Sequence, residues 1–314
     1  MKRILITGAA GYIGLKTAEC LSGRPDVEAI VGIDVKHPPR PVGKFTFYSR
    51  DVRSPLRDIM ERHAIDTVIH AAFILPPIHD RKKMDDVNVN GTRAVLDSCV
   101  QAGVKQVLYT SSTTAYGFHA DNRRPLTEEN PLRGNPDVAY ADAKRIIEGI
   151  FRQYERLHPE IDFIIVRPCF VVGPGFDNPL SRYVRKRIVP VPGETAPLQF
   201  VHEDDLVEVV CRLLAGKKKG AYNVAGEGEL SIREMAAMLG NTCVSLPYGV
   251  LYPLNGAAWA LRLTLLSEFP SPYLQMIRYS WIASTEKLKR ELGYEFKYDT
   301  VSAYEDFVKF VKKK

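Results

Sequence analysis

The sequence predicts an α/β protein in which a doubly wound parallel sheet carries a smaller, partly discontinuous C-terminal lobe. The 314 residues are 45% hydrophobic and 25% charged, which supplies a sizeable core and suits about two domains. Apolar runs of strand length alternate with helical patterns, and this alternation is typical of right-handed βαβ units. A glycine-rich string follows the first run directly, at residues 7–14.

The expected strands and helices alternate through the first half of the chain. Strands are expected at residues 3–7, 29–34, 67–70, 106–110 and 163–167, and helices at 12–21, 87–101 and 140–157. Glycine and proline then become frequent between Pro168 and Pro197, which indicates that the chain leaves the sheet. Short strands at 200–202 and 221–224 are expected to return. The predicted domains are residues 1–170 with about 199–225, and a smaller lobe of about 171–198 with 226–314.

Cysteine usage and charge exclude several classes of function. The five cysteines are widely spaced and form no C-x-x-C pair, so neither a metal site nor a disulfide framework is predicted. The first residues, MKRILITGAAGYIG, lack the apolar region of a signal peptide, and a cytoplasmic location is therefore expected. A net charge of +6 without an aromatic-rich basic stripe argues against nucleic acid as a partner.

The segment 248–266 is the most apolar part of the chain. A membrane span needs about 20 largely uninterrupted apolar residues. Pro253, Asn255 and Arg262 interrupt this segment. We expect a helix that lines the smaller lobe, with peripheral contact to a membrane surface as the alternative.

The glycine string TGAAGYIG at residues 7–14 predicts a dinucleotide site. Gly8, Gly11 and Gly14 permit a tight turn, a close approach of backbone N–H groups to a pyrophosphate, and close packing of the following helix, which begins with Tyr12 and Ile13. The string lies between an expected strand and an expected helix, which is the context that this motif requires.

Two acidic positions bear on the choice of dinucleotide. Asp34 ends the second strand, where a carboxylate accepts hydrogen bonds from ribose hydroxyls and repels a 2′-phosphate, so NAD is favoured over NADP. Asp51 and Val52 follow the third strand and are expected at the adenine edge. A plain helix cap formed by Asp51 is an equal alternative.

Four further strings occur in a fixed order: HAA at 70–72, NVNGT at 88–92, TSSTTAYG at 110–117 and YADAK at 140–144. Together with the glycine string they resemble the extended short-chain dehydrogenases/reductases of the NAD-dependent epimerase/dehydratase type, over about the first 225 residues. The resemblance implies a Rossmann sheet, an NAD-dependent enzyme, and a C-terminal lobe that binds the substrate.

Tyr140 and Lys144 are four residues apart on an expected helix and therefore project from one face. A neighbouring ammonium favours the phenolate, so Lys144 is expected to lower the pKa of Tyr140. Tyr140 could then exchange a proton with a substrate alcohol or ketone while hydride moves to or from the nicotinamide. Ser112 matches the catalytic serine of the family and would bind the reacting oxygen. The resemblance also assigns Lys144 to the nicotinamide ribose.

The resemblance implies further contacts. Ala71, Ala72 and Phe73 are expected on the nicotinamide side, with Pro168 and Cys169 crossing nearby. Asn88 is expected to contact the cofactor, although a helix N-cap is its alternative role. Phe73, Ser112 and Phe170 are expected to contact the substrate.

The pattern departs from nucleotide-sugar enzymes at two places. Relatives that act on nucleotide sugars typically carry asparagine at the position of Phe170 and an arginine, which grips diphosphate, near residues 197–199. With an aromatic-rich C-terminal lobe, these changes favour an oxidoreductase that interconverts a secondary alcohol and a ketone on a largely apolar, steroid-, lipid- or polyketide-like small molecule.

Two alternatives remain open at this point. One is a nucleotide-sugar 4-epimerase with tightly bound, recycled NAD, and the other is a non-catalytic NAD-binding regulator. The resemblance and the expected helices at 87–101 and 140–157 also suggest a homodimer.

Overall fold

The computed structural model describes residues 1–216 and 218–313. Its strands are β1 (Lys2–Thr7), β2 (Val27–Asp34), β3 (Phe45–Ser49), β4 (Thr67–His70), β5 (Gln106–Thr110), β6 (Asp162–Pro168), β7 (Phe170–Val172), β8 (Ile188–Pro192), β9 (Phe200–His202), β10 (Gly220–Val224) and β11 (Thr242–Leu246).

The helices are α1 (Tyr12–Ser22), α2 (Arg57–Arg62), α3 (Arg81–Asp85), η1 (Asp86–Asn90), α4 (Gly91–Gln101), η2 (Thr113–Tyr116), α5 (Ala139–Leu157), α6 (Pro179–Val184), α7 (Glu203–Ala215), α8 (Ile232–Met238), α9 (Tyr248–Ala260), η3 (Ser271–Leu274), α10 (Gln275–Arg278), α11 (Glu286–Leu292) and α12 (Thr300–Lys312). Here η1 is a π-helix, and η2 and η3 are 3₁₀-helices.

A seven-stranded parallel sheet forms the larger part of the molecule, in the order β10-β6-β5-β4-β1-β2-β3. The strand order reverses between β1 and β4, so the crevice at their carboxyl ends is the place where open α/β sheets bind ligands. Thr7 at the end of β1 pairs with Ile33 on β2 and with His70 on β4. The ends of these three strands therefore lie together at one edge.

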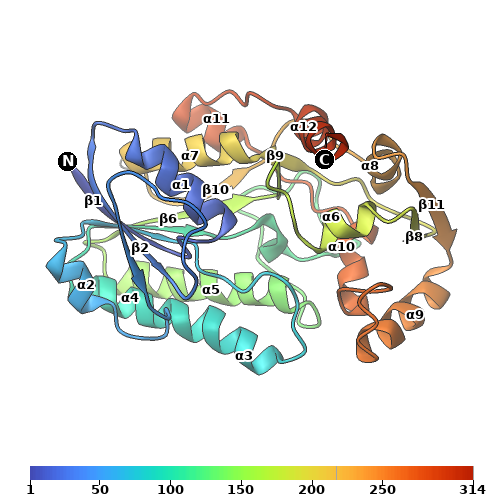
Figure 1. The fold of residues 1–314 in the computed structure, drawn as a ribbon, viewed down its shortest axis with the longest axis horizontal. Coiled ribbons are helices and arrows are strands. Elements are labelled where there is room, and N and C mark those ends of the chain that lie inside the picture. The colour runs from blue at the N-terminus through green and yellow to red at the C-terminus, as the bar shows by residue number, and fades with distance from the viewer. Residues whose placement is uncertain (217, 314) are drawn as a thin grey trace.

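Both faces of the sheet are buried, which explains the continuous apolar runs. On one face, Ile4 and Ile6 pack with residues of α1 and α7. On the other face, Leu5 packs with residues of α2, α4 and α5. Figure 1 shows α1, α7 and α11 on one side of the sheet and α2, α4 and α5 on the other.

All five cysteines are free thiols, and the Cys20 and Cys211 sulfurs lie 3.3 Å apart between α1 and α7.

The smaller lobe contains two short sheets and a core of its own. β11 pairs with β8, and β7 pairs with β9. The strand expected at 200–202 therefore does not return to the seven-stranded sheet, whereas the strand expected at 221–224 does so as β10. Phe176, Phe200, Tyr304 and Phe307 lie in its aromatic centre. Figure 1 places α9 at the outer edge of this lobe. Within the described residues, no helix is both long enough and apolar enough to cross a membrane.

Candidate active site

Glycines bring the start of α1 against the ends of β1 and β4. Gly8 has a φ of +71°, and a Cβ there would lie 2.6 Å from the backbone nitrogen of Ala72. A Cβ on Gly14 would lie 2.2 Å from the carbonyl oxygen of Gly8. Gly11 is the N-cap residue of α1 and supplies no side chain to its free N–H groups. This turn is therefore a backbone cradle that can receive an anionic group.

The carboxylate of Asp34 lies beside this cradle. One oxygen accepts a hydrogen bond from Ala10 N at 3.0 Å, and the other accepts one from Lys36 N at 3.0 Å. Each carboxylate oxygen retains a further lone pair. Asp34 thus fixes the glycine loop through Ala10 and keeps acceptor capacity next to it.

Ser112, Tyr140 and Lys144 come from two neighbouring segments and face one cavity. Ser112 is the N-cap of η2, and its Oγ donates to the Pro168 carbonyl at 3.3 Å. Lys144 lies one turn after Tyr140 on α5, and its Nζ donates to the Thr110 carbonyl at 2.7 Å. The Tyr140 ring meets the Phe73 ring edge to face at 5.3 Å, and the ammonium lies 3.9 Å from the centre of the Phe73 ring.

Burial shifts the pKa values of the tyrosine and the lysine in opposite directions. Loss of water raises the pKa of Tyr140, and contacts with the hydroxyls of Ser112 and Thr114 act against this rise. Burial lowers the pKa of Lys144 to about 7, while the Glu148 carboxylate acts in the opposite direction. The expectation that Lys144 lowers the pKa of Tyr140 is wrong, because desolvation dominates. At neutral pH the phenol is protonated and can donate its proton.

A buried ion pair supports this face of α5. The guanidinium of Arg167 and the carboxylate of Glu148 are 2.6 Å apart, and both side chains are fully buried. Ser111 donates to the same carboxylate at 2.6 Å, and Arg167 donates to the hydroxyl of Tyr116 at 2.7 Å. The network fixes the turn that carries Ser112 against the helix that carries Lys144. Glu148 follows Lys144 by four residues, and this spacing was the available sequence signal for its role.

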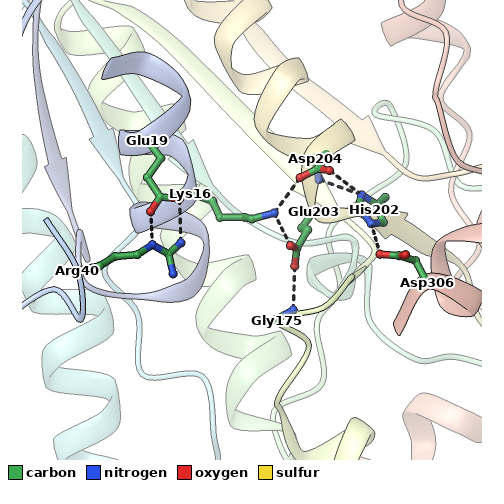
Figure 2. A network of polar contacts seen from close by, with 8 residues as sticks. All are labelled: Lys16, Glu19, Arg40, Gly175, His202, Glu203, Asp204 and Asp306. Carbon is green, nitrogen blue, oxygen red and sulfur yellow. Dashed lines mark hydrogen bonds and ion pairs between the residues drawn. The ribbon is translucent and has the colours of Figure 1, made fainter. Parts of the chain in front are cut away.

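A second polar network, shown in Figure 2, holds α1 in place. Lys16 on α1 contacts Glu203 and is 2.8 Å from Asp204 at the start of α7. Glu203 accepts a hydrogen bond from Gly175 N at 3.2 Å. Gly175 packs so closely on the ring of Tyr12 that a Cβ would lie 2.4 Å from it. The network therefore joins the cofactor helix, the loop after β7 and the start of α7.

A cavity of about 390 Å³ lies between the glycine loop, the Ser112–Tyr140–Lys144 group and the smaller lobe. The smaller lobe contributes mainly apolar and aromatic side chains to its wall. These lining residues are Phe176, Asp177, Asn178, Pro179, Leu180, Tyr183, Phe269, Tyr273, Leu274, Met276, Ile277 and Trp281.

Most residues predicted for the site line this cavity. They are Gly8, Gly11, Tyr12, Ile13, Gly14, Ala71, Phe73, Ser112, Tyr140, Lys144, Pro168, Cys169 and Phe170. Cys169 is a buried thiol whose pKa is raised by that burial, which suits a packing role. Thr114 also lines the cavity and was missed, although it lies two residues after Ser112 in the same string.

Five predicted residues lie outside the lining: Asp34, Asp51, Val52, Ala72 and Asn88. Asp51 is 2.6 Å from the guanidinium of Arg53, which holds the pKa of that carboxyl below its usual value. Val52 is buried. Asn88 lies inside η1 and is not an N-cap, and its Oδ1 accepts a hydrogen bond from Ile74 N at 2.8 Å. Asn88 therefore fixes the loop that carries Phe73.

Comparison with protein families gives one match that covers most of the chain. The model of the NAD dependent epimerase/dehydratase family matches residues 4–225. The chain belongs to this family. As a member of the family it is an enzyme of the extended short-chain dehydrogenase/reductase type, and its cofactor is NAD.

Individual proteins are also similar to this chain. A UDP-glucose 4-epimerase of Erwinia amylovora is 30% identical over 273 residues, which cover 74% of this chain and 80% of the relative. An uncharacterized protein of Mycobacterium tuberculosis is 28% identical over 315 residues, covering 98% of this chain and 83% of the relative. The crystal structure of the Bordetella bronchiseptica enzyme WbmG with NAD and UDP has a TM-score of 0.77 at 20% identity, covering 99% of this chain and 94% of that one, and shows the same fold.

The residues present fit NAD. The start of α1 has no side-chain cap, so its N–H groups stay free to meet an anionic group, and the close backbone packing at Gly8 and Gly14 holds the turn in this form. The buried hydroxyl of Tyr12 lines the cavity and finds no hydrogen-bond partner within residues 1–216 and 218–313. Gly8, Gly11 and Gly14 would receive the pyrophosphate, and Lys144 would lie at the nicotinamide end. When bound, NAD supplies the acceptor or donor of a hydride.

Proposed function

We propose that this enzyme interconverts a secondary alcohol and a ketone on a largely apolar small molecule, with NAD as an exchanged co-substrate. The main support for this proposal is the apolar character of the cavity wall on the side of the smaller lobe and its lack of free cations among the described lining residues. Among the described residues that line the cavity, Lys144 is the single cation, and its ammonium is bound to the Thr110 carbonyl. Asp177 adds a carboxylate to the same wall.

Such a cavity would bind a diphosphate weakly. Diphosphates are bound best by bidentate arginine, and a carboxylate repels them. Arg182 of the smaller lobe, which follows the lining residues Pro179 and Leu180, is paired with Asp177 at 2.8 Å and with Glu268 at 2.5 Å. Leu198 and Gln199 are buried, and Gln199 donates to the carbonyl oxygens of Gly226 and Ala283. These positions supply packing and structural hydrogen bonds, with no cation for a phosphate.

The aromatic side chains suit an apolar substrate. Phe170 and Trp281 both line the cavity and meet edge to face at 5.1 Å. Tyr273 and Phe269 extend the same wall. Burial of apolar substrate surface against these rings supplies binding energy at about 25 cal/mol per Å². The polar hydroxyls of Ser112, Thr114 and Tyr140 lie at one end and would orient a single oxygen.

The reaction moves one proton and one hydride in each direction. In ketone reduction, Tyr140 would donate its phenolic proton to the carbonyl oxygen, and reduced NAD, when bound, would supply the hydride that the carbonyl carbon needs. In alcohol oxidation, the same two transfers run in reverse. The Ser112 hydroxyl binds the reacting oxygen in both states, because it can donate and accept. The raised pKa of Tyr140 keeps the phenol in its protonated form at neutral pH, which is the form that donates a proton to a ketone.

The second candidate is a nucleotide-sugar 4-epimerase, which the 30% identity to the UDP-glucose 4-epimerase of Erwinia amylovora favours. A panel assay separates the two. NADH formation is measured with apolar secondary alcohols, and interconversion of UDP-glucose and UDP-galactose is measured with the same preparation. We expect NADH formation with the alcohols and none of the sugar interconversion. Efficient sugar interconversion without net NADH would contradict the proposal.

A further inference from the structure

We infer that the outer surface of α9 and the turn after it docks on an anionic phospholipid bilayer. This α9 surface is defined by six exposed side chains, Val250, Leu254, Leu261, Leu263, Leu265 and Leu266. Leu265 is 90% exposed and Leu261 is 69% exposed. Four of the six lie between Leu261 and Leu266, and exposed apolar side chains that are gathered in this way mark interaction surfaces, whereas singly scattered ones do not. The inference goes beyond the proposed reaction and is testable without turnover.

The sequence of α9 explains why both of its faces are apolar. Leu251, Asn255 and Ala258 recur at helical spacing and are buried against the smaller lobe. Val250 and Leu254 lie beside this buried stripe and are exposed. A surface helix normally carries charged residues at its exposed positions. Here no charged residue occurs within α9, and no carboxylate occurs between Glu234 and Glu268.

Cations border the α9 surface. Arg262 lies among the exposed leucines, with a φ of 56° at the end of the helix. The Nζ of the half-buried Lys186 donates to the carbonyl oxygen of Leu266 at 2.9 Å, which places the exposed Arg185 and Arg187 near the same edge. At the start of α9, the Arg278 guanidinium lies 4.1 Å from the centre of the Tyr248 ring. Exposed leucines bordered by cations are complementary to an interface of acyl chains and anionic headgroups.

The α9 surface lies next to the mouth of the cavity. Trp259 on α9 stacks on His79 with ring centres 4.1 Å apart. Four residues before His79, the exposed side chain of Leu75 lines the cavity, as does the neighbouring exposed Pro76. Phe269, which follows the α9 surface, lines the cavity from the other side. Figure 1 shows α9 at the edge of the molecule, where a flat bilayer could approach it. An apolar substrate dissolved in that bilayer would be close to the cavity mouth.

Vesicle flotation with the full chain tests this inference. Phosphatidylcholine vesicles with and without phosphatidylglycerol are the probes, at low and at high salt. The test variant is Leu261→Ser with Leu265→Ser, which changes two exposed positions and spares the core. The control is Leu157→Ser, since Leu157 ends α5 in the larger domain and is 64% exposed. Thermal melts show that each variant is folded.

We expect the protein to float with the anionic vesicles and to release at high salt. Affinity should fall about tenfold or more in the double variant and stay unchanged in Leu157→Ser. The inference is overturned if the folded protein ignores anionic vesicles, or if the double variant floats like the parent. It is also overturned if vesicles are ignored and sedimentation velocity shows a dimer that the double variant abolishes, because the α9 surface would then bind a second copy.

Discussion

Tyr140 and Lys144 occupy one dry corner of the cavity, where burial raises the pKa of the phenol and lowers the pKa of the ammonium to about 7. The two groups are one helical turn apart, but the ammonium is bound to the carbonyl oxygen of Thr110. Spacing on a helix predicted their shared face correctly. It could not predict whether the charge of Lys144 or desolvation dominates the pKa of Tyr140, because desolvation depends on Phe73 and other residues distant in sequence.

Tyr140 is the proton donor of the proposed reaction. Tyr140→Phe should lower turnover by about 10²–10⁴-fold, because the variant keeps the ring and loses the exchangeable proton. NAD affinity measured by calorimetry should stay near the parent value, since the ring still packs on Phe73. In the parent enzyme, the rate of alcohol oxidation should rise with pH toward the raised pKa of Tyr140. A variant with turnover within tenfold of the parent would contradict this role.

The buried ion pair gives a second prediction at the residue scale. Glu148→Gln should cost about 3–5 kcal/mol in the free energy of unfolding, because the buried Arg167 guanidinium loses its charged partner. Urea denaturation measures this loss. The double variant Glu148→Met with Arg167→Met should recover most of the stability, since it leaves no unpaired charge. Equal stability of Glu148→Gln and the parent would rule out the pair as a structural element.

At the scale of elements, α1 depends on close contact at its first turn. Gly14→Ala should lower NAD affinity by about tenfold or more, because the Cβ would lie 2.2 Å from the Gly8 carbonyl oxygen and push the turn apart. The control is Gly149→Ala inside α5, where nothing lies within 4 Å of the added Cβ. That variant should keep NAD affinity and gain about 0.5–1 kcal/mol of stability. Unchanged NAD affinity in Gly14→Ala would disprove the close-contact role.

The network of Figure 2 predicts a pH-dependent stability. Burial, together with Asp204 and Asp306, raises the pKa of Glu203 to about 7, although the hydrogen bond from Gly175 N and the Lys16 ammonium both favour the carboxylate. Between pH 4.5 and pH 7 the folded state therefore holds a proton that the unfolded chain has released, and this contribution to stability is lost as pH rises through the window. The melting temperature of Glu203→Gln relative to that of the parent should rise between pH 4.5 and pH 7. Above pH 7 the difference between the two should stay constant. A difference in melting temperature that is the same at every pH would contradict the raised pKa of Glu203.

Long, periodic elements were predictable and contacts across the chain were not. The expected strand at 67–70 and the expected helices at 12–21 and 140–157 agree with β4, α1 and α5 to within a residue or two. The helix expected at 87–101 begins instead as the π-helix η1, which turns Asn88 toward Ile74. A local pattern could not reveal this, because the hydrogen bond joins two segments whose separation is set by the fold.

At the scale of the whole molecule, the strand reversal between β1 and β4 and the lobe over it create one cavity with two different ends. The cofactor end follows from strings of neighbouring residues and was predictable from the sequence. The substrate end draws on residues scattered between Phe170 and Trp281, so its apolar character could be expected only from composition. The pairing of Arg182 with Asp177 and Glu268 became visible only in the fold.

Transfer of a labelled hydride distinguishes net oxidation of an alcohol from epimerisation with recycled NAD. The enzyme is given NAD and an apolar secondary alcohol that carries deuterium on the carbinol carbon, and released NADH is analysed by mass spectrometry. We predict one deuterium in free NADH for each ketone formed, and transfer about 10²–10⁴-fold slower with Tyr140→Phe. Absence of deuterium from free NADH, with UDP-hexose as the accepted substrate and NAD retained on the protein, would contradict the account and assign the enzyme to epimerisation.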